Sequence, residues 1–183
     1  MKKRFLIFVL VMSIPFIITN QSYAASDWTG NINLALGEKW PVYPLPDNQK
    51  EVGLNVDFGK KSWPLHIAFA ILGSSSSYTE DEGSITASTS ELRFGANKIW
   101  ETAPAKQPCI YLGCGLALTH GEVEHQWDGQ SIGGYVNGGI FWTLAEHYNL
   151  GIDLGYSKAT DHSSHVGFGM GGGHATLFFG YHW

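Results

Sequence analysis

The sequence predicts an all-β fold, an eight-stranded antiparallel up-and-down transmembrane β-barrel. Apolar residues alternate with small or polar ones in eight separate segments, which is the periodicity of strands with two unlike faces. Long and short connections take turns between these segments, and the chain ends on an aromatic-rich strand. Beyond residue 25, no stretch approaches the roughly 18 consecutive apolar residues of a spanning helix.

The first element has the composition of a secretory signal peptide. Three basic residues open the chain, an apolar stretch follows from Phe5 to Ile18, and small residues come next. The apolar stretch is shorter than the roughly 20 residues of a spanning helix, so an uncleaved anchor is the less favoured alternative. We expect a signal peptide over residues 1–24, cleaved after Ala24 or after Ala25, and a barrel domain over residues 25–183.

Removal of residues 1–24 changes the charge balance. It takes away three of the 11 Lys and Arg and none of the 16 Asp and Glu, which leaves 8 basic and 16 acidic side chains and a net charge of −8. Binding to phosphate backbones requires clustered cations, so we expect no nucleic-acid partner.

Apolar residues at every second position mark the eight strands. In chain order the segments are Ile32–Leu36, Val52–Phe58, Trp63–Ile71, Leu92–Trp100, Ile110–Leu118, Val136–Leu144, Tyr148–Tyr156 and Ala175–Trp183. The opposite face of these strands holds mostly Gly, Ala, Ser, Thr, Asn and Tyr. A face in contact with water would be rich in charges, so we expect this face inside the barrel and the apolar face against lipid. A soluble barrel with the apolar face inside is the alternative.

The connections alternate in length. Long ones are expected at Trp40–Lys50, Gly73–Thr86, His120–Ile132 and Lys158–Gly172, and short ones at Gly59–Ser62, Glu101–Pro108 and Ala145–His147. In membrane barrels the short turns face the periplasm and the long loops face outside. The pattern therefore predicts four external loops and two periplasmic chain ends.

Four charged residues fall on the inward face by strand parity: Asp57, Glu91, Arg93 and Asp153. Buried charges are normally paired, so we expect a barrel-interior polar network that fills the cylinder. An ion path gated by these pairs is the alternative. Eight strands enclose just enough space for side chains, which disfavours a water-filled pore.

The external connections contain clustered histidines and acids: His120, Glu122, Glu124, His125, Asp128, Asp161, His162 and His165. Imidazole and carboxylate are zinc and copper ligands, but solvated loop residues are the favoured interpretation, and we expect no metal or cofactor. Residues 161–165 also bring together an acid, a base and hydroxyls, as a lipid A-modifying acyl hydrolase would require. We nevertheless expect a protein that is not an enzyme.

The two cysteines, Cys109 and Cys114, are five positions apart. On one continuous strand they face opposite sides and lie about 17 Å apart, too far for a disulfide. We therefore expect free thiols, although an exported chain with an even number of cysteines favours pairing.

Three stretches carry a resemblance to known proteins: Glu91–Trp100, Tyr111–Leu118 and Leu177–Trp183. They resemble the small outer-membrane β-barrel proteins of Gram-negative bacteria, of the porin-like and opacity-type families. The resemblance implies an outer-membrane location, delivery by periplasmic chaperones and insertion by the barrel-assembly machinery. It also implies contact with outer-membrane lipid and lipopolysaccharide.

The last strand resembles the C-terminal insertion signal of such barrels, carried by Leu177, Phe179, Tyr181 and Trp183. Fold alone does not supply function. We expect a monomeric, non-enzymatic barrel with a structural or surface-interaction role. A lipid A-modifying acyl hydrolase and a small passive channel are the alternatives.

Overall fold

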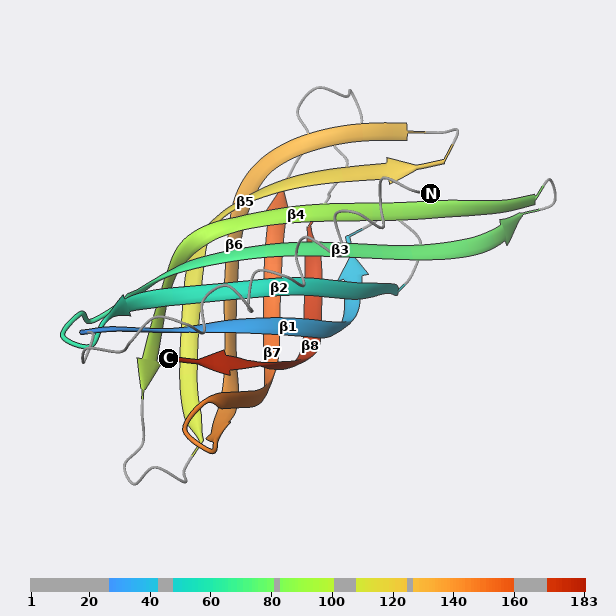
Figure 1. The fold of residues 1–183 in the computed structure, drawn as a ribbon. Helices are drawn as coiled ribbons and strands as arrows, with labels where there is room; N and C mark the ends of the chain where they lie inside the picture. Colours follow the sequence, from blue (N-terminus) through green and yellow to red (C-terminus); the bar gives the residue numbers. More distant parts are fainter. Residues whose placement is uncertain (1–26, 43–47, 81–82, 101–107, 125–126, 160–170) are drawn as a thin grey trace, which may run out of the picture.

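The chain folds into a closed barrel of eight antiparallel strands (Figure 1). This computed structural model describes residues 27–42, 48–80, 83–100, 108–124, 127–159 and 171–183. Each strand pairs with the next, and β8 closes the cylinder against β1. The strands are β1 Trp28–Pro41, β2 Gln49–Lys60, β3 His66–Glu80, β4 Gly83–Trp100, β5 Cys109–Val123, β6 Trp127–Leu144, β7 Tyr148–Ala159 and β8 Gly172–His182. The predicted fold class is confirmed.

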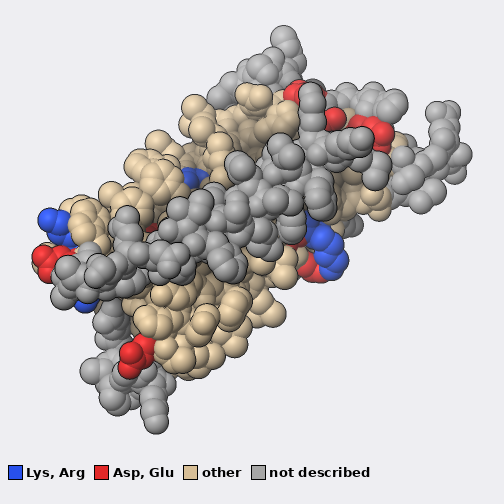
Figure 2. All heavy atoms as spheres, viewed as in Figure 1, with Lys and Arg blue, Asp and Glu red and all other residues tan. Residues whose placement is uncertain are grey.

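The two faces of each strand alternate as the sequence pattern predicts. On β5, for example, Leu112 and Leu116 are about 60% exposed, whereas their sequence neighbours Tyr111 and Ala117 are buried. The outer surface carries a continuous apolar belt of Leu, Ile, Val and Phe. On the face shown in Figure 2, charged side chains lie mainly towards the two ends of the barrel.

Tryptophan and tyrosine mark the two margins of the apolar belt. Trp28, Trp63 and Trp100 lie at the end that carries the β2–β3 connection and the β6–β7 turn, here called the short-turn end. Trp40 and Tyr156 lie towards the opposite end, here called the hairpin end. Two aromatic girdles around an apolar band are typical of barrels that span a membrane. The described residues include no helix that is long and apolar enough to cross a bilayer.

Two of the expected long loops are wrong, because strands occupy most of Gly73–Thr86 and His120–Ile132. The β3–β4 ladder continues to the pair Glu80 and Gly83, and the β5–β6 ladder continues to Val123 and Trp127. Both segments are poor in apolar residues, so the alternation of apolar and polar residues does not mark them as strands. A hydrogen-bonded ladder requires no apolar face, so serine- and glycine-rich strands can extend beyond the barrel.

These extensions form a sheet that projects past the neighbouring strands. Strand β2 pairs with β3 only as far as Ser75, and β7 pairs with β6 only from Gly133 onward. Strands β4 and β5 remain paired up to Ala87 and Val123. The paired strands therefore stand out together at the right and upper right of Figure 1, and we call residues 76–80, 83–87, 119–124 and 127–132 the projecting sheet.

Other expected boundaries differ by a few residues. Strand β1, for example, is longer at both ends than the expected segment Ile32–Leu36. Strand β3 begins at His66 rather than Trp63, since Pro64 lacks the N–H that a ladder needs. The short turn at 145–147 is confirmed, with positive φ at Ala145 and Glu146. Most of the other two long connections, and residues 101–107, lie outside the described residues.

Candidate functional site: the barrel interior

The structure places all four predicted charged residues inside the barrel, and each is more than nine-tenths buried. Asp57 comes from β2, Glu91 and Arg93 from β4, and Asp153 from β7. Glu91 and Arg93 form one ion pair, whereas Asp57 and Asp153 each bind other polar groups nearer the short-turn end. The four residues therefore belong to three linked clusters.

The first cluster surrounds Glu91. One carboxylate oxygen accepts a hydrogen bond from Arg93 Nε at 2.6 Å, and the other accepts one from Ser157 Oγ at 2.9 Å. Lys39 Nζ lies 3.6 Å from that second oxygen and donates to Thr89 Oγ1 at 3.0 Å. Two cations and a hydroxyl thus saturate a carboxylate that is almost wholly removed from water, which offsets the cost of burying its charge.

His174 extends this cluster to a second carboxylate. Its Nδ1 lies 2.7 Å from Glu51 Oε2, and its Nε2 lies 3.2 Å from Ser157 Oγ. Serine, histidine and acid in this order are the parts of a hydrolytic triad. Ser157 however gives its one hydroxyl hydrogen to Glu91, so it can only accept from His174. The serine is also fully buried, and the arrangement is suited to structure rather than to nucleophilic attack.

The second cluster is an aromatic layer inside the barrel. The rings of Tyr111, Phe141 and Phe178 pack with centroids 6.1 to 6.4 Å apart. The Tyr111 hydroxyl donates a hydrogen bond to Asp153, which also accepts one from Asn137 Nδ2 at 2.9 Å. The layer fills part of the interior and holds Asp153 in place.

Glycines make room for the inward aromatic rings. Tyr111 pairs across the ladder with Gly139, and Phe178 pairs with Gly151. A Cβ on Gly139 would lie 2.7 Å from the Tyr111 ring, and one on Gly151 would lie 2.6 Å from Phe178 Cζ. A large ring lying over a cross-strand glycine fills the space that the missing side chain leaves.

The third cluster lies near the short-turn end. Asn31 Nδ2 donates to both oxygens of Asp57 at 2.9 and 3.0 Å, and His66 Nδ1 lies 2.9 Å from the same carboxylate. Asn149 Nδ2 donates to Asn31 Oδ1 at 2.7 Å, and His182 Nδ1 lies 2.9 Å from that oxygen. Amides and imidazoles, rather than cationic chains, satisfy the acid here.

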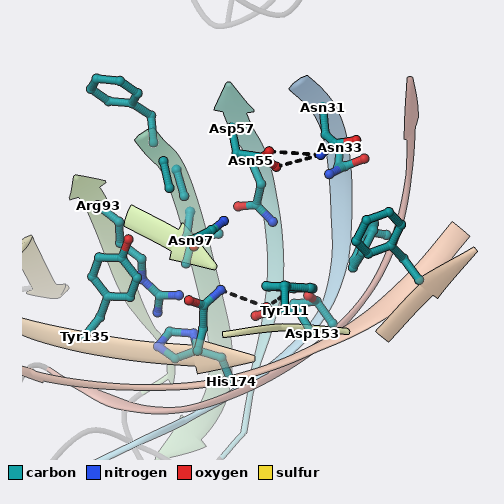
Figure 3. A pocket seen from close by; sticks show the side chains of 18 of the residues that line it. Asn31, Asn33, Asn55, Asp57, Arg93, Asn97, Tyr111, Tyr135, Asp153 and His174 are labelled. Atoms are coloured by element: carbon teal, nitrogen blue, oxygen red, sulfur yellow. Dashed lines mark hydrogen bonds between the residues drawn. The ribbon is translucent and has the colours of Figure 1, made fainter. Parts of the chain in front are cut away.

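A narrow cavity of about 50 Å³ runs between the three clusters (Figure 3). Three buried side-chain atoms that find no hydrogen-bond partner among the described residues belong to side chains lining this cavity: Arg93 Nη2, Asn97 Oδ1 and Asn137 Oδ1. A buried water needs about 10–15 Å³ of such space, so the cavity has room for about four waters. The interior can therefore hold a few waters between its polar groups and is too narrow for a dissolved solute.

Sequence reasoning missed three interior charged or titratable residues: Lys39, Glu51 and His174. All three are fully or almost fully buried. Strand parity would have found them, because Glu51 lies on the face of Asp57 and His174 on the face of Phe178. The expected strands were a few residues too short at the hairpin end, where the apolar alternation stops.

The other predicted residues lie apart from these clusters. Leu177 and Phe179 are exposed on the outer face of β8, with Tyr181 and Trp183 half-buried after them. Their role as an insertion signal stays a prediction.

The two cysteines lie on opposite faces of β5 and are not joined in a disulfide, as their spacing predicts. Of the histidines and acids expected in the loops, His120 Nδ1 lies 3.9 Å from Asp128. His125 and residues 161–165 lie outside the described residues. Among the described residues, no three His, Cys, Asp or Glu side chains are arranged to hold a metal ion.

Comparison with solved structures identifies proteins with a similar fold. The chain has the fold of the small outer-membrane β-barrels. Neisserial surface protein A matches with a TM-score of 0.61 at 15% identity, over 87% of this chain and 99% of that one. Ail, the attachment invasion locus protein of Yersinia pestis, solved with the heparin analogue sucrose octasulfate, matches with 0.59 at 12%, over 85% and 97%. OprG from Pseudomonas aeruginosa matches with 0.57 at 13%, over 85% and 95%. No family model and no curated protein matches the sequence.

Proposed function

We propose that the chain is a non-enzymatic outer-membrane barrel that presents its projecting sheet to a partner outside the cell. The observation that carries this proposal is the extension of β3, β4, β5 and β6 beyond the rest of the barrel. Because the barrel interior is filled, the parts able to meet another molecule are the outer surface and the two ends. Location in the outer membrane, with a signal peptide over residues 1–24, belongs to the same proposal.

The outer face supports placement in a membrane. Large apolar side chains such as Ile71 and Leu177 are about 60% exposed around the belt, which is unfavourable in water. Strands of about ten residues tilted at about 40° cross roughly 25 Å of hydrocarbon. Contact with lipid and lipopolysaccharide, assembly by chaperones and the barrel-assembly machinery, and a monomeric state follow from this placement as further proposals.

The edges of the projecting sheet supply a mode of interaction. The β2–β3 ladder ends at Ser75, and the β6–β7 ladder begins at Gly133. The outer edges of β3 beyond Ser75 and of β6 before Gly133 are therefore not paired by these neighbouring strands. An open edge offers backbone N–H and C=O groups to an added extended segment. This arrangement favours recognition of an extended peptide through its main chain.

Site-directed labelling tests the proposed orientation. With both native cysteines changed to alanine, Ser77→Cys in the projecting sheet is expected to react with a membrane-impermeant maleimide in intact cells. The matched variant Ser62→Cys, in the exposed β2–β3 connection, is expected to react only after the outer membrane is opened. Reaction of Ser62→Cys alone in intact cells, or recovery of the chain in the soluble fraction, contradicts the proposal.

A small passive channel is the second candidate, favoured by the polar cavity along the barrel axis. Room for only about four waters beside the aromatic layer argues for at most a rare, small conductance. Recordings in planar bilayers distinguish the two proposals, since a large and stable conductance would replace the surface-interaction role.

A further inference from the structure

A second cavity, of about 480 Å³, lies at the short-turn end. Its lining comes from β1, the β2–β3 connection, β3, β4 and β8: Thr29, Lys61, Trp63, Pro64, His66, Lys98, Ile99 and His182. Four of these eight lining residues have basic side chains, and none is acidic. The cavity is therefore biased towards anions.

The two lysines supply the charge. Neither Lys61 nor Lys98 belongs to an ion pair within the described part of the chain. Lys61 is exposed on the β2–β3 connection, and Lys98 is half-buried near the end of β4. The two cations come from separate elements and line the same cavity, so an anion bound there would be attracted by both.

The two histidines are held in position from within. His66 Nδ1 lies 2.9 Å from Asp57 Oδ1, and His182 Nδ1 lies 2.9 Å from Asn31 Oδ1. A hydrogen bond at one ring nitrogen fixes the orientation of the ring and the tautomer. Gly59 contributes as well, since a Cβ there would lie 2.8 Å from His66 Cδ2. The imidazoles are thus oriented before any ligand arrives.

We propose that this cavity, the basic mouth, binds an oxyanion of the phosphate type. An ammonium group binds phosphate as a point charge with three donors. An imidazole whose Nδ1–H is already donated to an oxygen acts as a directed donor at Nε2 in its imidazolium form. The volume exceeds that of inorganic phosphate, so the group recognised would be the phosphoryl end of a larger molecule. That molecule is either a phospholipid headgroup from the adjacent leaflet or a free phosphorylated solute. The site lies at the opposite end from the projecting sheet, so it does not depend on the proposed function.

Titration of the full-length folded protein tests the site. In a nonionic detergent free of phosphate, calorimetry with inorganic phosphate and with glycerol phosphate is expected to show saturable binding that weakens with added salt. The double variant Lys61→Gln/Lys98→Gln is expected to bind about tenfold more weakly or worse, since each lost cation removes a charge-assisted contact. The matched control is Lys50→Gln/Lys158→Gln, which removes two exposed lysines near the hairpin end.

A lipid arm distinguishes the two sources of the phosphoryl group. The same variants are placed in nanodiscs of phosphatidylcholine alone or with phosphatidylglycerol, and the amide and imidazole NMR signals at the mouth are followed. Shifts that depend on phosphatidylglycerol and on both mouth lysines identify a headgroup, whereas binding of glycerol phosphate in either lipid identifies a free solute. Heat-modifiable migration on a gel checks that each variant is folded. Absence of saturable binding in both arms, or equal binding by the mouth variant and the hairpin-end control, overturns the proposal.

Discussion

The inner and outer faces of the same eight strands follow opposite rules. Outside, large apolar side chains are exposed in a belt, and neighbouring positions share one chemistry. Inside, the charged side chains have particular partners, as Glu91 has in Arg93, Ser157 and Lys39. Outer positions therefore require only a side chain that lipid accepts, whereas inner positions require a specific shape and a specific partner. The two faces should respond differently to the same kind of substitution.

The largest effect is expected for an inner charge. Arg93→Met leaves Glu91 without its 2.6 Å partner in a site that is almost wholly buried. Breaking a buried ion pair from one side costs about 3–5 kcal/mol of unfolding free energy. Urea unfolding in lipid vesicles, followed by tryptophan fluorescence, measures the change.

A double variant tests whether pairing is the reason. Glu91→Gln/Arg93→Met removes both charges, so it is expected to be more stable than Arg93→Met alone. If the double variant loses at least as much stability as the sum of its two single variants, the inner face does not depend on the pairing of these charges.

On the outer face, a charged side chain destabilises the barrel because it contacts lipid and not because it has lost a partner. Leu116 lies within the apolar belt of β5 and is 62% exposed. Leu116→Arg is expected to cost about 2–4 kcal/mol of unfolding free energy in vesicles, as for arginine near the middle of a bilayer. The matched control Ser77→Arg, beyond the belt, is expected to change it by less than about 0.5 kcal/mol. Equal costs for both variants would show that position 116 does not face hydrocarbon.

The difference between the faces also explains what the sequence could predict. Strand number, strand parity and the inward placement of Asp57 and Arg93 follow from alternation, which is a local property. The contacts between inner side chains do not follow from alternation. Glu51 and His174, for example, are 123 positions apart in the sequence, and they meet because the barrel is closed. The register that brings them together is set by the whole barrel.

The projecting sheet was missed for a related reason. Ser74–Ser77 and the glycine-rich stretch before Tyr135 lack an apolar face, so alternation gave no signal there. Their strand structure comes from ladder hydrogen bonds to a partner strand, as between Ser75 and Ser88. Periodicity detects strands with one apolar face, and it fails where neither face is apolar.

A smaller contrast is expected for glycines on the two faces of β6. A Cβ on the inward Gly139 would lie 2.7 Å from the Tyr111 ring, whereas one on the outward Gly134 would meet only a carbonyl oxygen at 3.6 Å. Gly139→Ala is expected to cost about 1–3 kcal/mol of unfolding free energy through overpacking. Gly134→Ala is expected to be neutral or slightly stabilising, since alanine restricts the unfolded chain. Equal losses in the two variants would contradict the assignment of faces.

The smallest effect on stability is expected where the strands leave the barrel. Ser76 pairs with Ala87, so residues 77–86 can be replaced by Asn-Gly, which forms a two-residue turn between these partners. Ala87 is fully buried and is retained, and the removed residues contribute nothing to the three interior clusters. The unfolding free energy should therefore change by less than about 1 kcal/mol, because a shorter loop costs slightly less to close. Heat-modifiable migration should be unchanged while any partner binding through this edge is lost. If the shortened chain fails to fold, the projecting sheet contributes to the stability of the barrel. The contrast between the inner and outer faces would then not explain that contribution.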